Sequence, residues 1–229
     1  MLYTQQAPGL ASAFGYVRAT VLSKIGPVYG VGTAFNSKFG TNTLTRLSTG
    51  TYRVEFPSLG VSGGTVLVSA EGTEPRVCSA IDWFTTATSA EAVLVTCHDL
   101  AGSLADGLFT VTFSDSRSVA GTARLRAHAW VPALGPNSPP HTPNSIWALN
   151  STGGPITVTR KSQGKYDVRI TGVASSTNGF AAVNSTGSGS DRCQYSTMDL
   201  TGADVIVSVQ CRTPAGALVD AEFVLQYLW

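Results

Sequence analysis

The chain has 229 residues, of which 13% are charged and 43% are hydrophobic, and its formal net charge is +1. This balance argues against a dedicated nucleic-acid-binding protein, which would carry a basic patch or a high pI, and against a disordered chain. No apolar run approaches the roughly 20 residues of a membrane span, so we expect neither a nucleic-acid partner nor membrane insertion.

Apolar and polar residues alternate with a period of two along the chain, which predicts β-strands. Strands are expected first at residues 14–20, 32–35 and 43–47. In the next strand, Tyr52, Val54 and Phe56 share one face, while Arg53 and Glu55 lie on the other. Later strands are expected at residues 65–69, 92–96, 108–113, 205–209 and 221–227. Turn-forming residues separate the segments about every 8 to 12 residues, which is typical of sandwiches and barrels.

The chain contains two related copies of one unit. Residues 45–56 (TRLSTGTYRVEF) return as residues 159–170 (TRKSQGKYDVRI), a shift of 114 positions. The same shift relates Asp106 to Asp220 and Tyr16 to Trp130, which predicts equivalent strand positions for the last two. We therefore expect a first domain at residues 1–115, a short polar linker at 116–126 and a second domain at 127–229.

Each copy contains two cysteines, separated by 19 or 18 residues, and these spacings fit no zinc pattern. Their equivalent placement predicts the disulfides Cys78–Cys97 and Cys193–Cys211, each worth about 3 kcal/mol in the chain-entropy model. Four free buried thiols are the alternative. Disulfides persist outside the cytosol, so we expect a secreted protein. The first residues lack the pattern of a signal peptide, so we expect that signal to have been removed.

Two short patterns resemble known groups. The step Gly50-Thr51-Tyr52 resembles the entry into a strand that is common in bacterial immunoglobulin-like sandwiches. The spacing of Cys97, Ala101, Gly102, Asp106 and Phe109 returns at residues 211–223 and resembles tandem-repeat proteins of soil-bacterial secreted proteomes. These resemblances imply secretion and repetition but no activity. The expected fold is all-β, with two tandem, mostly antiparallel, immunoglobulin-like β-sandwich domains.

No residue pattern predicts a catalytic or metal site. Residues 60–64 match the G-x-S-x-G nucleophile elbow, but that motif needs a strand, a turn and a helix, and a β segment follows here. His98, His128 and His141 lack the spacing of metal ligands. A Ser-His-Asp site and a calcium ion held by carboxylates and carbonyls stay open. We expect no cofactor, no metal and, on balance, no enzymatic activity.

Tryptophans supply the main binding candidates. Trp147 lies next to the proline-rich segment 134–144, and Trp83 lies between the cysteines of the first copy, beside Asp82. Tryptophan side chains can stack against the C–H faces of sugar rings, and burial in the core is the competing interpretation. We therefore take Trp83, Trp147 and Asp82 as candidate ligand contacts.

Arg46 and Arg160 are equivalent residues that end a strand before a turn. The structural interpretation is a charge-assisted hydrogen bond to Asp106 or Asp220, and the functional interpretation is a ligand contact.

The favoured function is non-catalytic binding of a glycan or a cell-surface polymer by a secreted protein. Two weak sites on one chain would raise the apparent affinity. The alternatives are a structural or adhesin-like module with a protein partner, and a hydrolase with an unusual site.

Overall fold

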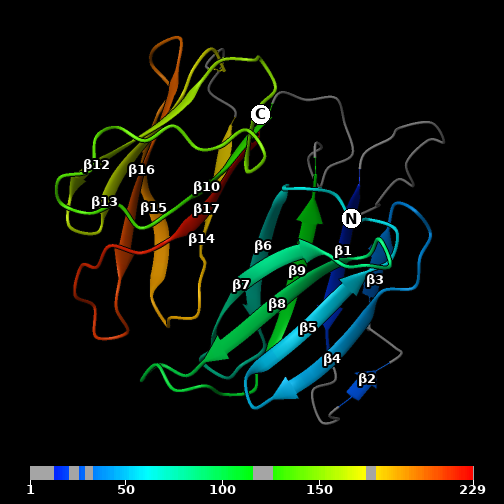
Figure 1. Ribbon diagram of the computed structural model, residues 1–229. Helices are drawn as coiled ribbons and strands as arrows, with labels where there is room; N and C mark the ends of the chain where they lie inside the picture. The colour runs from blue at the N-terminus through cyan, green and yellow to red at the C-terminus, as the bar shows by residue number, and fades with distance from the viewer. Residues whose placement is uncertain (1–12, 21–25, 29–32, 116–125, 174–178, 229) are drawn as a thin grey trace.

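A computed structural model of the protein describes residues 13–20, 26–28, 33–115, 126–173 and 179–228. The expected linker at 116–126 lies outside the described residues, except for Arg126. Residue 32, the first residue of the strand expected at 32–35, and residues 1–12 also lie outside them. Every regular element within the described ranges is a β-strand, so none of them contains a helix that could span a membrane (Figure 1).

The strands fall into an N-terminal half and a C-terminal half of the chain. The N-terminal half contains β1 (Phe14–Ala19), β2 (Gly26–Val28), β3 (Thr33–Asn36), β4 (Thr43–Ser48), β5 (Thr51–Phe56), β6 (Thr65–Glu71), β7 (Val77–Thr85), β8 (Glu91–His98) and β9 (Leu108–Ser114). The C-terminal half contains β10 (Arg126–Val131), β11 (Ala148–Asn150), β12 (Ile156–Ser162), β13 (Lys165–Ile170), β14 (Phe180–Ser185), β15 (Arg192–Asp199), β16 (Val205–Arg212) and β17 (Phe223–Leu228).

Each half is a sandwich of two antiparallel sheets, so the predicted all-β sandwich architecture is confirmed. In the N-terminal half, sheet A has the order β3-β1-β9-β6 and sheet B the order β2-β4-β5-β8-β7. In the C-terminal half, sheet C has the order β11-β10-β17-β14 and sheet D the order β12-β13-β16-β15. Apart from β2, the two halves have the same strand order. In both halves, the last strand lies beside the first.

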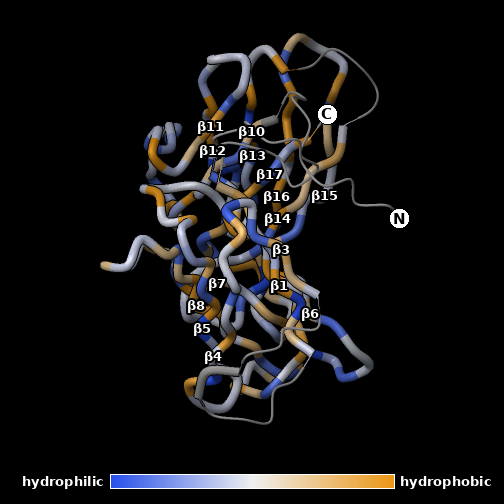
Figure 2. Tube along the Cα trace, turned by 90° about the vertical axis from the view of Figure 1, so that its right-hand side faces the viewer, coloured by the Kyte–Doolittle hydropathy of each residue, from blue (hydrophilic) through white to orange (hydrophobic). Residues whose placement is uncertain are grey.

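The core of each sandwich is built from the inward positions of alternating strands. Tyr52, Val54 and Phe56 are fully buried, as the alternation in β5 predicts. The rings of Tyr52 and Phe109 lie 5.1 Å apart and join sheets B and A. The equivalent rings of Tyr166 and Phe223 lie 5.3 Å apart in the C-terminal half. Figure 2 shows the resulting interleaving of hydrophobic and hydrophilic residues along the chain.

Both predicted disulfides are present. Cys78–Cys97 joins β7 to β8, and Cys193–Cys211 joins β15 to β16, each between directly opposed residues. Each bond therefore joins neighbouring strands of one sheet rather than the two sheets of a sandwich. Disulfides of this kind indicate an oxidising environment.

The two halves meet edge to face. The edge strands β6 and β7 of the N-terminal half lie beside the outer face of sheet C, near β14 and β17 (Figure 1). The Asn184 side chain pairs with the outer edge of β6: its Nδ2 donates to the Val68 carbonyl at 2.8 Å, and its Oδ1 accepts from the Val68 amide at 3.0 Å. The Gly187 amide donates to the Ala80 carbonyl of β7 at 3.2 Å.

The G-x-S-x-G segment is part of this junction. It leads into β6 and not into a helix, so it lacks the geometry of a nucleophile elbow. Gly63 has φ +93°, and a Cβ there would lie 1.8 Å from the carbonyl oxygen of Ile146, next to Trp147. The backbone conformation and the close approach of the C-terminal half both require glycine.

Gly63→Ala should therefore destabilise the junction. We expect a loss of stability well beyond the roughly 1–2 kcal/mol of a left-handed non-glycine residue, together with a change in tryptophan fluorescence. Urea unfolding followed by fluorescence measures both. The matched control is Gly72→Ala, because Gly72 has φ +100° but its nearest neighbour to a new Cβ is Leu108 Cδ1 at 3.6 Å. Equal effects of the two substitutions would contradict the role of the Ile146 contact.

Candidate functional site

A β-bulge in β7 shapes the candidate site. Ala80 pairs with Val95 and Asp82 with Leu94, so Ile81 is the extra residue. A bulge bends its strand and redirects the side chains that follow. Because the carbonyl of Ala80 accepts a hydrogen bond from the Gly187 amide, this bend lies where the two halves touch.

Beside the bulge lies a cavity of about 260 Å³, which we call the tryptophan pocket. It is lined by residues of both halves: Ile81, Asp82, Trp83, Trp130, Trp147 and Glu222. Trp83 is 5% exposed, and its ring meets that of Trp147 edge to face, with centroids 5.4 Å apart and an interplanar angle of 85°. The Trp130 amide donates to the Trp147 carbonyl at 2.9 Å, which ties the two tryptophans of the C-terminal half together.

The charge of the pocket is negative. Asp82 and Glu222 supply two carboxylates, and no Lys, Arg or His side chain is among the lining residues. Neither carboxylate forms an ion pair with any residue that the structure describes, although Asp82 Oδ1 accepts from the Trp83 amide at 2.8 Å. The Nε1 of Trp83 is buried without a hydrogen-bond partner within the described part of the chain.

The structure brings three predicted candidates together, since Trp83, Asp82 and Trp147 all line this pocket. The competing interpretation, burial, is observed for Trp83, and Trp147 is partly buried against the core of the N-terminal half, while their contact with a ligand stays a prediction. Sequence analysis missed Trp130 and Glu222.

The predicted equivalence of Tyr16 and Trp130 is wrong. Ala19 pairs with Phe109 and Val131 pairs with Phe223, so Trp130 occupies the position of Arg18. The second copy is two residues longer between this strand and β11, so a constant shift of 114 positions misplaces the strand. The outer face of sheet C therefore carries Trp130 towards the N-terminal half, where it packs against that core.

The pocket does not recur in the second copy. In β15, Thr197 and Met198 occupy the positions of Asp82 and Trp83. Under the 114-residue shift, Glu222 and Trp147 correspond to Leu108 and Thr33. Several positions at which the two copies differ in chemistry thus line one pocket, and this difference was the signal in the sequence that could have revealed Glu222.

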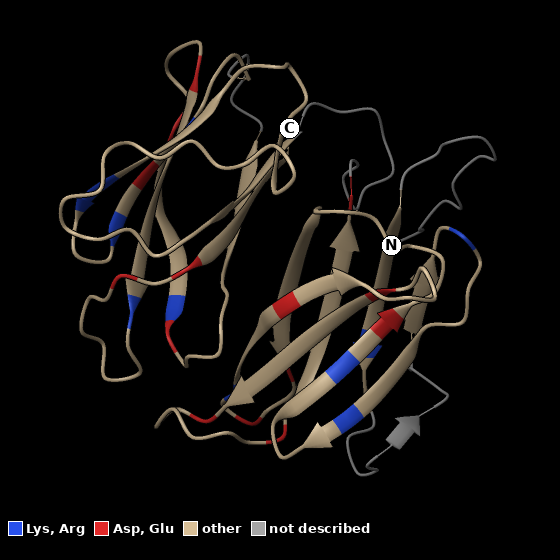
Figure 3. Ribbon diagram, in the orientation of Figure 1, with Lys and Arg blue, Asp and Glu red and all other residues tan. Residues whose placement is uncertain are grey.

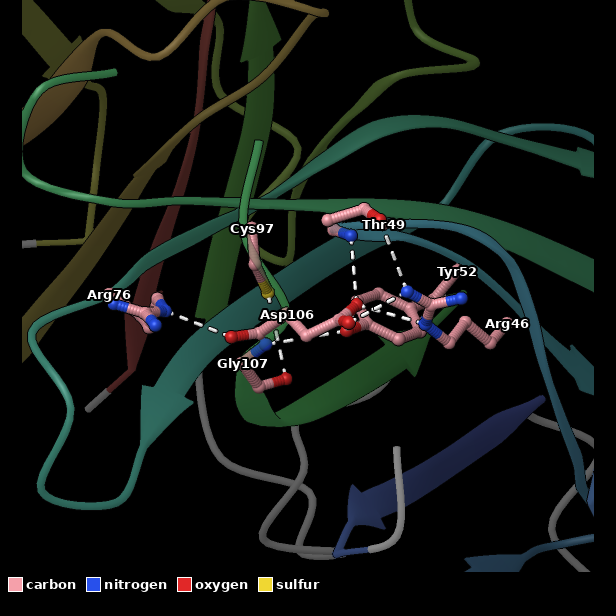
Figure 4. A network of polar contacts seen from close by, with 8 residues as sticks. Arg46, Thr49, Tyr52, Arg76, Cys97, Asp106 and Gly107 are labelled. Carbon is pink, nitrogen blue, oxygen red and sulfur yellow. Dashed lines mark hydrogen bonds and ion pairs between the residues drawn. The ribbon is translucent and has the colours of Figure 1, made fainter. Parts of the chain in front are cut away.

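Arg46 and Arg160 do not reach the pocket lining and instead form two equivalent polar networks. Arg46 donates from Nε and Nη2 to the two oxygens of Asp106, at 3.0 and 2.7 Å (Figure 4). Asp106 Oδ1 also accepts from the Gly50 amide at 2.9 Å and from the Tyr52 hydroxyl at 2.7 Å. The structure thus contains the ion pair that the structural interpretation of Arg46 predicts.

The second network repeats these contacts with Arg160, Asp220, Gly164 and Tyr166, at distances of 2.8 to 3.0 Å. Hydrogen bonds from Arg46 lower the pKa of Asp106 well below its usual range, and hydrogen bonds from Arg160 lower the pKa of Asp220. Burial raises the pKa values of Tyr52 and Tyr166. Each network fixes the loop before the last strand to the β4–β5 or β12–β13 turn, which is a structural role.

Asp220→Asn should cost about 1–2 kcal/mol of stability near neutral pH, because a charged acceptor of four hydrogen bonds is lost. The folded-state pKa is lowered, so this stabilisation is present above the ordinary pKa of 3.8 and is lost as the pH falls below it. Urea unfolding at neutral and strongly acidic pH measures the change. Asp106→Asn should cost less, since that side chain is 37% exposed against 22% for Asp220. A pH-independent difference would contradict the linkage.

Glu91 is a buried carboxyl group of the N-terminal half that has no equivalent, because Val205 takes its place in β16. Its Oε2 accepts from the Val61 amide at 3.3 Å and from the Thr85 hydroxyl at 3.4 Å, and its Oε1 has no partner among the described residues. Burial raises the pKa of Glu91 to about 8.

Glu91→Gln should stabilise the protein at alkaline pH. The unfolded chain loses this proton near pH 4.5 and the folded chain near pH 8, so stability falls as the pH rises between these values. For one proton, the free energy of unfolding falls by up to about 1.4 kcal/mol per pH unit. Urea unfolding across this range should show a flatter profile for the variant. Parallel profiles, or the same change in the exposed control Glu74→Gln, would contradict the assignment.

A second cavity, of about 720 Å³, lies on the other side of the junction, and we call it the neutral groove. Outward residues of sheet A, such as Ser69 and Thr110, face residues of β14 and β15 across it. Phe180 and Tyr195 line it and are 56% and 47% exposed. No charged side chain is among its lining residues. Charged residues elsewhere are sparse and of mixed sign (Figure 3).

The remaining polar residues do not assemble a metal site. No group of three or more His, Cys, Asp or Glu side chains within the described ranges could hold a metal ion. Comparison of the chain with protein-family models, curated proteins and solved structures gives no significant match.

Proposed function

We propose that the protein is a secreted, non-catalytic binding protein for a glycan or a cell-surface polymer, and that the tryptophan pocket is its binding site. One observation carries this proposal: three tryptophans from distant parts of the chain line one cavity together with two carboxylates. Indole rings pack against the C–H faces of sugars, and carboxylates accept hydrogen bonds from sugar hydroxyls.

The junction gives a reason for having two units in one chain. The first half supplies Trp83 and Asp82, and the second supplies Trp130, Trp147 and Glu222. One composite site therefore replaces the expected pair of equivalent sites, and its affinity would come from the meeting of the halves rather than from avidity. The two disulfides support an extracellular location, because they persist in oxidising compartments.

A glycan array with the oxidised protein tests this function. We expect saturable binding to one class of bacterial or plant polysaccharide, reduced at least about tenfold, or 1.4 kcal/mol, by Trp147→Ala. Tyr195→Ala is the comparison variant, because it removes an exposed aromatic side chain from the neutral groove and leaves the pocket intact. Circular dichroism and thermal unfolding establish that the variants are folded.

A protein-interaction module is the second candidate, and the neutral groove favours it. Phe180 and Tyr195 are large exposed aromatic side chains on the edge strands β14 and β15, with which an extended peptide could pair. A blank array, combined with peptide binding that Tyr195→Ala abolishes and Trp147→Ala leaves intact, would replace the first proposal by this one.

A further inference from the structure

The tryptophan pocket has a charge that a neutral sugar would leave uncompensated. Seven ion pairs engage carboxylates elsewhere in the described residues, but Asp82 and Glu222 take part in none of them. Glu222 is only partly exposed and lies with Asp82 beside the indole rings. Asp82 is exposed, and the attraction between these carboxylates and a cation would grow where the indole rings displace water from around the pair. The lining residues supply no cation, so a ligand that carries one would gain most.

The indole rings favour a particular kind of cation. Tryptophan is the best aromatic partner for an organic ammonium group, and the attraction grows when the cation is desolvated. Indoles are not metal ligands. The two carboxylates of the pocket supply fewer oxygen ligands than a calcium or magnesium ion needs. The residues therefore suit an ammonium group attached to carbon.

The size of the pocket limits the ligand group to one sugar ring. A volume of about 260 Å³ lies below the roughly 300–1,000 Å³ of sites for drug-sized molecules. An amino sugar combines the required parts, since its ring presents C–H groups to indoles, its hydroxyls can donate to carboxylates, and its amine is a cation when protonated.

We propose that the tryptophan pocket binds a hexosamine unit through its free ammonium group, so that the glycan recognised is a polymer with unacetylated amino sugars. This inference rests on the proposed glycan-binding function and names the ligand class for the same site. Asp82 and Glu222 pair with the ammonium group and hydroxyls, and Trp83, Trp130 and Trp147 enclose the ring. N-acetylation of the sugar removes the positive charge and with it the main source of selectivity.

Isothermal titration with three oligosaccharides of equal length tests the inference: β-1,4-linked glucosamine, its N-acetylated form and β-1,4-linked glucose. At mildly acidic pH, where the amines are protonated, the glucosamine oligomer should bind at least about tenfold tighter than the other two. Added salt should weaken its binding, because the contact is between charges. Tryptophan fluorescence should change on binding, since three of the four tryptophans line the pocket.

Asp82→Asn and Glu222→Gln should each remove the preference for glucosamine while keeping the shape of the pocket. Glu74→Gln is the matched control: it removes the same charge from a side chain that is 75% exposed and outside the pocket lining, and the preference should remain. Asp82 is exposed, so its substitution leaves the fold intact, which thermal unfolding verifies.

The outcomes separate the inference from the function on which it rests. Equal binding of all three oligosaccharides, reduced by Trp147→Ala, would uphold glycan binding and overturn the ammonium assignment. Binding of tetramethylammonium without binding of any oligosaccharide would overturn both the amino-sugar proposal and the glycan function. Preference for glucosamine that survives both Asp82→Asn and Glu222→Gln would place the selectivity elsewhere and overturn the inference.

Discussion

The outer backbone groups of an edge strand need partners, and in this protein the other half of the chain supplies them. Asn184 pairs with both polar groups of Val68 through its side-chain amide, in the way that a neighbouring strand would. Sheet C is buried on its outer face as a result, and Val224 and Gln226 are 0% and 4% exposed. The tryptophan pocket and the neutral groove both lie along this junction and depend on it. A change that separates the halves would remove the pocket without touching a pocket residue.

Much of the fold follows from local patterns in the sequence. The alternation in residues 52–56 predicts which side chains of β5 are buried, and the paired cysteines predict both disulfides. The strand order does not follow, because the pairing of β1 with β9 joins residues almost 100 positions apart and depends on how the whole sandwich closes. The predicted antiparallel sandwich is confirmed, but the resemblance to immunoglobulin-like sandwiches does not specify this strand order.

The site was only partly predictable for a similar reason. Trp83 and Trp147 stand out because the chain has only four tryptophans, but nothing local shows that these two meet. Trp130 was misplaced because the shift of 114 positions does not apply to β10, where the shift is 112. Glu222 has no local pattern at all and becomes meaningful only when compared with Leu108. Arg46 and Arg160, by contrast, repeat with their aspartates, and the repeated residues have structural roles in both halves.

Asn184 has a consequence for how the protein can be produced. Asn184-Ser185-Thr186 and Asn150-Ser151-Thr152 are acceptor sequences for N-glycosylation, which attaches its sugar to the side-chain nitrogen during synthesis. In the folded protein, that nitrogen of Asn184 donates to Val68, and that of Asn150 donates to Thr171. A glycan at Asn184 would occupy the place where β6 must dock. A eukaryotic secretory host would thus make a chain whose two halves cannot close together, whereas a bacterial periplasm would supply the disulfides without this modification.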